Sequence, residues 1–371
     1  MKLLFIIGTR PEAIKLSPII IEARKRGIHS EILCTGQHTK MVREVLGTFD
    51  LTSDHHIKSL SKGDNLGVMT SKIVLIIDEI FKSLEKNMPT IVMVQGDTVS
   101  AFIGALVSFY HNTKVAHIEA GLRSNSKNSP FPEEMMRRLI SKIADYHFCP
   151  TSRSINNLIS EGTDKANCFL VGNTGIDALF TLVKNLPEWD NQDIKHIFTE
   201  KEKVILMTFH RRENWQIAED IFVAIKNAVD KYENVHVIFP VHPNPFLVKL
   251  ADKVFQGHKN ITLTHPMVYG DFVNAMVRSY FIVTDSGGIQ EEAPYIKKPV
   301  IVVRRETERM EGVDENVALL VGVNPMELQH KIKQLLHDKP FYDSFCNAES
   351  LKIYGDGRSS EKIMDILMKD V

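Results

Sequence analysis

The sequence predicts an α/β protein with two doubly wound parallel sheets, one in each half of the chain. Short apolar runs of four to six residues alternate with longer segments that carry apolar residues at helical spacing. Most of these runs are nearly continuous in apolar residues, as expected for strands of a parallel sheet with helices on both faces. A polar stretch at 186–202 interrupts the alternation, which then resumes. We therefore expect two such units in series.

The predicted elements follow in order along the chain. In the first half, strands are expected at 3–7, 31–35, 91–95, 115–118, 146–150 and 168–172, and helices at 11–26, 66–85, 100–110 and 133–144. In the second half, strands are expected at 204–208, 235–240, 261–264, 281–284, 300–303 and 318–321, and helices at 218–231, 245–255, 269–277 and 326–337.

These elements predict two domains, at 1–172 and 173–358. A final helix within 359–371 is expected to pack back on the first domain. The length of 371 residues is typical of a two-domain protein, and it allows a large apolar core without disulfide bonds.

Composition and charge exclude several classes of protein. The formal net charge is -1 and long basic runs are lacking, so neither nucleic acid nor a membrane is expected as a partner. Apolar runs stay far below the roughly 20 residues of a membrane span. The first run ends at Gly8 as a buried strand would, without the cleavage site of a signal peptide. The four cysteines lie far apart, which is typical of free thiols in the cytoplasm.

Metal, nucleophilic and dinucleotide chemistry lack their usual signatures. His55 and His56 are adjacent, and adjacent side chains on a strand or helix diverge instead of converging on one ion. The H-E-x-x-H, G-x-S-x-G and G-x-G-x-x-G patterns are absent. We therefore expect neither a bound metal nor covalent catalysis, and the fingerprint of a dinucleotide-binding site is absent.

Polar residues of the first half follow predicted strands, which is where ligands bind in a doubly wound sheet. Gly8 and Arg10 lie between the first strand and its helix, a place suited to an anion. Asp97 and Glu119 end successive strands, and Glu133 starts a helix a short loop later. Carboxylates that converge raise one another's pKa, which suits proton transfer. The alternative is that these residues are ordinary helix caps and solvated turn residues.

The clusters of the second half are cationic or rich in glycine. The turn at 286–288 separates a strand from a helix, where backbone N–H groups can hold a diphosphate. His210 and Arg211 follow another strand and offer a proton donor and a cation. His242 and the charged run 304–309 also follow strands, and Glu291 or Glu292 could accept hydrogen bonds from ribose hydroxyls. Read singly, each is also compatible with a helix start, a stiff loop or a solvated charge run.

The joint placement of these clusters is more specific than any one of them. All follow strands, with carboxylates in the first half and cations and glycines in the second. We therefore expect a nucleotide diphosphate in a central cleft that the two domains face, with its reacting group toward the first domain.

The same residues form motifs that are spread over essentially the whole chain. They are GTRPEAIKLSP (8–18), TGQH (35–38), QGDT (95–98), HIEAGLRS (117–124), PFPEE (130–134), HRREN (210–214), PVHPNP (240–245), DSGGIQEEAP (285–294) and YGDGRSS (354–360). In these forms and this order they resemble the non-hydrolysing UDP-N-acetylglucosamine 2-epimerases.

The resemblance implies a GT-B architecture of two Rossmann-like domains and reversible conversion of UDP-N-acetylglucosamine to UDP-N-acetylmannosamine. In this family UDP is eliminated as the C2 proton is removed, and it adds back to 2-acetamidoglucal with the proton delivered to the other face. The resemblance also implies a homodimer without a cofactor and a product that enters an envelope polysaccharide.

Roles follow from the motif match, residue by residue. The 286–288 turn would hold phosphate, Glu292 the ribose and Phe272 the uracil region, while the identity of the C2 base stays open among the first-domain carboxylates. The catalytic candidates are Asp97, Glu119, Glu133 and His210. The substrate-binding candidates are Arg10, Lys15, His38, Arg211, His242, Phe272, Ser286, Gly287, Gly288, Glu292 and Arg309.

Some positions depart from the family pattern. Met136 replaces the usual Asn after PEE, Met310 replaces the Pro of ERPE, and Met267 replaces a Gln common near uracil. Many bacterial members carry Arg-Gln where this chain has Gly63-Asp64, and those residues help to bind an activating UDP-N-acetylglucosamine. We expect activation to be weak or absent.

Other functions compete with this interpretation. Substitutions around the sugar leave room for a modified UDP-N-acetylhexosamine as substrate. A hydrolysing epimerase that releases free N-acetylmannosamine, or a GT-B glycosyltransferase, would share the fold, although hydrolysing relatives lack the GTRPE and HRREN forms. A catalytically inactive sugar-nucleotide sensor would need only the phosphate and uracil contacts.

Overall fold

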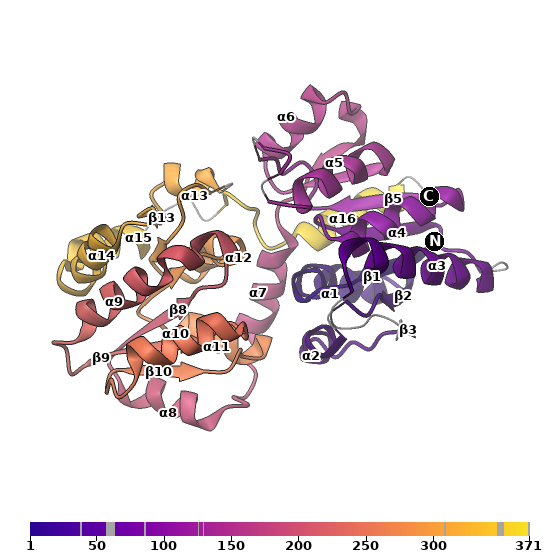
Figure 1. Cartoon of the computed structure of the whole chain (residues 1–371). Coiled ribbons are helices and arrows are strands. Elements are labelled where there is room, and N and C mark those ends of the chain that lie inside the picture. The colour runs from indigo at the N-terminus through magenta and orange to yellow at the C-terminus, as the bar shows by residue number, and fades with distance from the viewer. Residues whose placement is uncertain are drawn as a thin grey trace. The chain divides into compact units, whose positions relative to one another are not determined.

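The computed structural model describes residues 1–37, 39–56, 64–84, 87–124, 126–128, 130–307, 309–346 and 352–369. The chain forms two compact units (Figure 1). The first comprises Met1–Thr181 and Tyr354–Val371, and the second comprises Leu182–Ile353. Among the described residues, no helix is both long and apolar enough to span a membrane.

The described part of the first unit contains a sheet of seven parallel strands. Their order across the sheet is β3-β2-β1-β4-β5-β6-β7, so the direction of winding reverses between β1 and β4. The strands are β1 (Lys2–Ile7), β2 (His29–Cys34), β3 (His55–His56), β4 (Ile91–Gln95), β5 (Lys114–Ile118), β6 (Tyr146–Cys149) and β7 (Cys168–Leu170).

Helices cover both faces of this sheet. Alternate side chains of β1 face opposite sides, and Leu4 and Ile6 join the core beneath α3, α4 and α5. Helices α1, α2 and α16 pack together in a separate layer. The helices of the unit are α1 (Arg10–Lys25), α2 (Thr39–Thr48), α3 (Leu66–Ser83), α4 (Val99–Tyr110), α5 (Glu133–Ile143), α6 (Ser152–Ser160), α16 (Ser359–Lys369) and most of α7 (Thr174–Lys184), whose residues after Thr181 belong to the second unit.

The C-terminal helix α16 belongs to the first unit. Figure 1 shows it in yellow among the indigo and purple elements. It packs on α1, where Arg26 Nη1 lies 2.6 Å from Asp365 Oδ1. Asp177 of α7 accepts a hydrogen bond of 2.7 Å from the backbone N–H of Ser360, in the first turn of α16.

The second unit repeats the arrangement with six described parallel strands. Their order is β10-β9-β8-β11-β12-β13, with the reversal between β8 and β11. The strands are β8 (Lys203–Thr208), β9 (Val235–Pro240), β10 (Ile261–Thr264), β11 (Phe281–Thr284), β12 (Val300–Val302) and β13 (Ala318–Leu320). The helices are α8 (Gln192–Glu200), α9 (Ala218–Val229), α10 (Pro245–Phe255), α11 (Tyr269–Arg278), α12 (Gly287–Glu292), α13 (Met310–Asp314), α14 (Pro325–His337) and α15 (Lys339–Cys346).

The predicted fold class is confirmed, since both units are doubly wound and parallel. All twelve predicted strands are present, whereas β3, of only two residues, was not predicted. The polar stretch 186–202, which interrupts the predicted alternation, contains α8 and no strand among its described residues. The backbone N–H groups of Asp190 and Asn191 bond to Asp271, and Asn191 caps the helix, so tertiary contacts hold it in place.

Candidate active site

The first group of candidate residues surrounds the carboxyl ends of β1, β4 and β5. Gly8 follows β1, and a Cβ atom at this position would lie 2.0 Å from Ser100 Oγ, so only glycine fits beside the start of α4. Arg10 begins α1 and Lys15 lies one turn further along it. Asp97 follows β4 and Glu119 follows β5, two strands that pair in parallel. The topology therefore places these residues at one edge of one sheet, as predicted.

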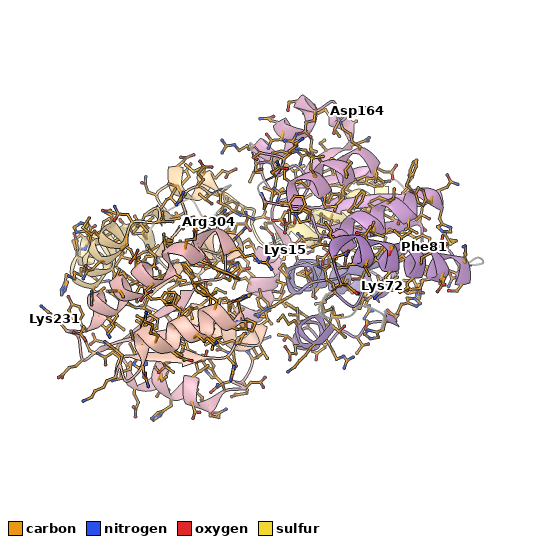
Figure 2. The ribbon with its side chains drawn as sticks, viewed as in Figure 1. Lys15, Lys72, Phe81, Asp164, Lys231 and Arg304 are labelled. Atoms are coloured by element: carbon orange, nitrogen blue, oxygen red, sulfur yellow. The ribbon has the colours of Figure 1, made fainter. Side chains whose placement is uncertain are left out.

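Glu119 is bound by two buried donors. Lys15, which Figure 2 labels on α1, donates to both carboxylate oxygens of Glu119 at 2.7 Å. Gln95, the last residue of β4, donates to Glu119 Oε2. Glu119 has a φ of 63°, a left-handed conformation that is uncommon for a residue with a side chain and that is often found at functional sites. Lys15 and Glu119, predicted from separate motifs, thus form one buried ion pair.

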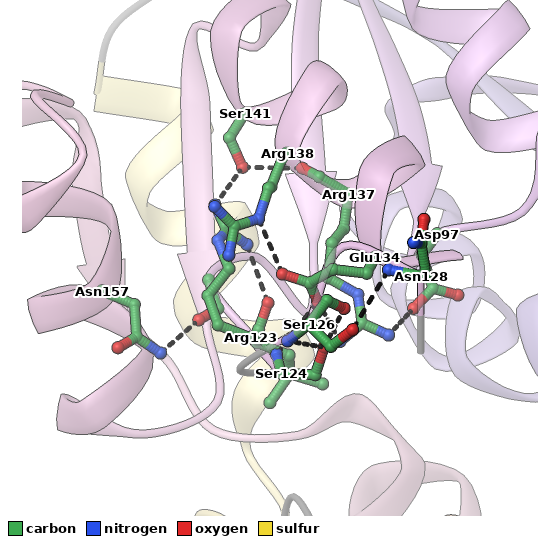
Figure 3. A network of polar contacts seen from close by, with 12 residues as sticks. Asp97, Arg123, Ser124, Ser126, Asn128, Glu134, Arg137, Arg138, Ser141 and Asn157 are labelled. Atoms are coloured by element: carbon green, nitrogen blue, oxygen red, sulfur yellow. Dashed lines mark hydrogen bonds and ion pairs between the residues drawn. The ribbon is translucent and has the colours of Figure 1, made fainter. Parts of the chain in front are cut away.

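Asp97 is paired with Arg137 of α5, a residue to which the sequence assigned no role. Arg137 Nη2 donates to Asp97 Oδ2, and its Nη1 lies 3.4 Å from Glu134 Oε2 (Figure 3). Two of the three predicted carboxylates therefore face cations.

Glu133, the third predicted carboxylate, is the first residue of α5 and is half-buried. Its Oε2 atom is buried and has no hydrogen-bond partner within the part of the chain that the structure describes. The neighbouring Glu134 is fully buried and bonded through both oxygens. Two adjacent acids at one helix start therefore have different environments, and only Glu133 has a buried oxygen left for another partner.

The sequence also missed the role of Glu12, which holds the loop between β1 and α1. Its fully buried carboxylate accepts hydrogen bonds from the backbone N–H groups of Gly8 and Thr9 and from the hydroxyls of Thr9 and Thr98. Burial raises the pKa of Glu12 to about 7, although these donors oppose the shift. The Glu12 carboxylate thus joins the first turn of α1 to the start of α4, beside Arg10.

The second group of residues lies at the carboxyl ends of β8, β9 and β11 in the second unit. His210 Nδ1 lies 3.0 Å from Asp285 Oδ1, and Asp285 also accepts the backbone N–H groups of His210 and Arg211. Burial of Asp285 disfavours its charge, but the bonds from His210 and Arg211 outweigh this, so the pKa of Asp285 is lowered. An ionised carboxylate that accepts Nδ1–H fixes the orientation of the ring.

His242 extends this group from the end of β9. Its ring is half-buried, and its pKa is lowered by burial and by the nearby charge of His210. A neutral His242 near the His210–Asp285 pair is compatible with a binding role.

The turn before α12 is covered by Arg309. A Cβ atom at Gly287 would lie 2.7 Å from the guanidinium carbon of Arg309. The absence of a side chain at Gly287 therefore allows the guanidinium to approach the backbone of this turn. Arg309 Nε lies 3.0 Å from Glu291 Oε1. Of the two acids that we considered for ribose, Glu291 therefore contacts Arg309, while Glu292 is also buried. At Gly288 a Cβ atom would make only an ordinary contact of 3.9 Å with Glu292.

The structure does not place every predicted residue in these groups. Phe272 lies in α11 and is half-buried. His38 lies outside the described residues. Arg304, labelled in Figure 2, lies after β12 and contacts Glu213, so this part of the run 304–309 is buried and ion-paired rather than solvated.

The fold and the site residues define a GT-B-like protein with two Rossmann-like units, each with polar residues at the switch point of its sheet. A family model described as UDP-N-acetylglucosamine 2-epimerase matches residues 21–368. The UDP-N-acetylglucosamine 2-epimerase of Bacillus subtilis is 40% identical over 370 residues, which cover 99% of this chain and 95% of that protein.

Solved structures of UDP-GlcNAc 2-epimerases are also similar to this chain. The UDP-GlcNAc 2-epimerase from Neisseria meningitidis bound to UDP-GlcNAc is 36% identical, with a TM-score of 0.90 and full coverage of both chains. The UDP-GlcNAc 2-epimerase from Methanocaldococcus jannaschii in complex with UDP-GlcNAc and UDP is 34% identical, with a TM-score of 0.85 and full coverage of both chains. The chain belongs to the UDP-N-acetylglucosamine 2-epimerase family.

Proposed function

We propose that the protein interconverts UDP-N-acetylglucosamine and UDP-N-acetylmannosamine by the non-hydrolysing route. The observation that carries the proposal is the group of three carboxylates, Asp97, Glu119 and Glu133, with Lys15 at one edge of the first sheet. Inversion at C2 needs a proton removed from one face of the sugar and returned to the other, which is work for positioned acid and base groups. The similar Neisseria meningitidis enzyme, in the structure cited above, is bound to UDP-GlcNAc.

The proposed reaction has two steps. A carboxylate of the first unit takes the proton from C2 as the C1–O bond breaks, and the departing oxygen of UDP keeps the bonding electrons. The product of this elimination is 2-acetamidoglucal. In the second step the UDP oxygen bonds to C1 again and a proton is delivered to C2 from the opposite face. Both steps are redox neutral, so the proposal includes no nicotinamide.

The second unit is proposed to bind UDP. Arg309 and the 286–288 turn would stabilise the charge that develops on the diphosphate. His210, oriented by Asp285 through Nδ1, would use Nε2 toward the departing oxygen. Glu292 is proposed to bind the ribose, and Phe272 to contact uracil.

Proton NMR of UDP-N-acetylglucosamine incubated with the enzyme in deuterated water tests this function. We expect both UDP-sugars to be present at equilibrium, each with deuterium at C2. Accumulation of UDP with free N-acetylmannosamine would instead establish a hydrolysing epimerase. Binding of UDP-N-acetylglucosamine without exchange or turnover would establish a sensor.

Variants then test the site. Glu119→Gln and Lys15→Met each remove half of a buried ion pair near the proposed reacting carbon, and we expect either change to lower kcat by roughly 100-fold or more. Lys2→Met is a matched control, because Lys2 is similarly buried and pairs with Glu31 at the opposite end of β1. A loss in Lys2→Met equal to that in Lys15→Met would refute a specific role for Lys15.

We further propose a cytoplasmic homodimer whose product enters an envelope polysaccharide. The four cysteines are all free thiols, which fits a reducing compartment. Helices α3, α4 and α5 pack side by side and expose large apolar side chains, among them Leu75, Phe109 and Leu139. Exposed large apolar side chains on neighbouring helices are a feature that subunit interfaces often have.

A further inference from the structure

A chain of alternating charges in the first unit ends at Asp97. Arg137 contacts Asp97 and Glu134, and Arg138 contacts Glu134 and Glu161. Glu161 in turn binds Arg123 through two bonds of 2.9 and 2.7 Å. Figure 3 shows how the side chains of α5 and of the loop after β5 converge in this network.

Within this network, the carboxylate of Glu134 is held by hydrogen bonds to both of its oxygens. It is fully buried, and a buried carboxylate needs compensating charge and hydrogen bonds. Its Oε1 accepts from Arg138 Nε at 2.7 Å, and its Oε2 accepts from the backbone N–H of Ser124 at 3.0 Å. Both oxygens are thus occupied by groups of the protein, so Glu134 is unsuited to exchange protons with a substrate.

Arg137 links the buried carboxylate of Glu134 to the partly exposed carboxylate of Asp97. Glu134 and Arg137 are three residues apart on α5, so they lie on the same face of the helix. Arg137 is buried, and its Nη1 faces Glu134 while its Nη2 binds Asp97, whose side chain is 26% exposed. Because the guanidinium is planar and rigid, the position of the Glu134 carboxylate constrains the position of the Asp97 carboxylate through Arg137.

We propose that Glu134 and Arg137 are positioning residues that hold the Asp97 carboxylate in place for proton transfer. This inference rests on the proposed function of Asp97. Small misplacement of a reacting group lowers the rate more than it lowers binding. Glu134 therefore acts on the reaction through Arg137, although it adjoins the catalytic candidate Glu133 in the sequence.

A double-mutant cycle tests the proposal. We expect Arg137→Met to lower kcat by roughly 100-fold while KM changes by less than about threefold. If Arg137 acts through Asp97, adding Arg137→Met to Asp97→Asn lowers kcat no further. Arg137→Lys keeps the charge without the fork, and we expect it to recover about a tenth of the lost rate. It is also the variant to use in the cycle should Arg137→Met fail to fold.

Lys2→Met provides the matched control, because Lys2 and Arg137 are both 7% exposed and both pair with carboxylates. We expect the effects of Lys2→Met and Asp97→Asn on kcat, corrected for the folded fraction, to multiply in the double variant. Independent, multiplicative effects of Arg137→Met and Asp97→Asn on kcat would overturn the proposal, since they would show that Arg137 contributes only to the fold.

A crystal structure of the Glu134→Gln variant gives a readout that does not depend on turnover. We expect the Arg137 guanidinium to leave its wild-type position and the Asp97 carboxylate to reorient with it. Unchanged positions of both side chains would overturn the proposal. A wild-type enzyme that failed to epimerise UDP-N-acetylglucosamine would refute the proposed function, while this structure would still decide whether Glu134 holds Arg137 and Asp97.

Discussion

Gly287 shows how a single missing side chain makes room for the guanidinium of Arg309. The Arg309 guanidinium occupies the space that a Cβ atom would take, and it contacts Glu291 from there. We expect Gly287→Ala to displace Arg309 and to weaken UDP binding by roughly tenfold, about 1.4 kcal/mol. Isothermal titration with UDP measures the change. Gly288→Ala is the control, since its new methyl group meets only an ordinary contact; equal losses in the two variants would contradict this account of Arg309.

We expect His147 to make the first unit sensitive to acid. Its ring is almost fully buried in β6, and burial, with a contribution from Arg123, lowers its pKa to about 4. The unfolded chain therefore binds this proton at a higher pH than the folded one. The stability that depends on neutral His147 is complete above about pH 6.5 and is lost as the pH falls toward 4, by at most about 1.4 kcal/mol per pH unit.

A variant that cannot titrate at this position tests the prediction. We expect His147→Phe to give a shallower loss of unfolding free energy between about pH 6.5 and 4.5 than the wild type, measured by urea unfolding. His196→Phe serves as control, because the side chain of His196 is 68% exposed. Should both variants follow the wild-type slope, the acid sensitivity has another origin.

The residues that the sequence found and those that it missed differ in a physical way. Lys15, Glu119 and Arg309 stand in motifs next to strand ends, where the rule for parallel sheets already places ligands. Arg137 and Glu134 lie on a helix face, and their importance comes from a contact with Asp97, 40 positions away for Arg137. Such pairing depends on how α5 packs against the loop after β4, which a single sequence does not encode in any local pattern.

At the scale of elements, α3, α4 and α5 pack side by side and expose several large apolar side chains. Leu75 is 64% exposed and Phe109 is 61% exposed, although both lie in regular helices of the first unit. We expect the wild type to be dimeric in sedimentation equilibrium, as proposed above, and the double variant Leu75→Asp/Phe109→Asp to be monomeric. Met326→Asp, at an apolar residue of α14 that is 77% exposed, is expected to remain dimeric. A dimeric double variant would place the interface elsewhere.

Strands were easier to predict than helices because many of them, such as β1 and β4, are buried on both faces and read as continuous apolar runs. The apolar runs of β4, β9, β10 and β11 match their predicted bounds residue for residue. Helices such as α2 and α8 are short and amphipathic, with few buried side chains, so their pattern hardly differs from that of a polar loop. Their ends are set by contacts, as Asp271 shows for the start of α8.

For the whole molecule, we predict turnover without a separate activating ligand. Asp64 stands where many bacterial relatives are expected to carry a polar residue that binds a second UDP-N-acetylglucosamine, and it forms an ion pair of 2.8 Å with Lys72. A carboxylate there repels a diphosphate. With UDP-N-acetylmannosamine as sole substrate, we expect the rate to be constant from the start. A long lag that traces of UDP-N-acetylglucosamine abolish would refute this prediction. Gly63, the other departure, lies outside the described residues.

The position of α16 has a consequence for biosynthesis. The second unit is one uninterrupted segment, Leu182–Ile353, while the first also needs residues that follow it in the chain. On the ribosome, the second unit can therefore complete its fold before the first. Until residues 359–369 leave the ribosome, the surface of α1 that α16 later covers is accessible to chaperones and to other nascent chains. The ion pair between Arg26 and Asp365 can form only after that point.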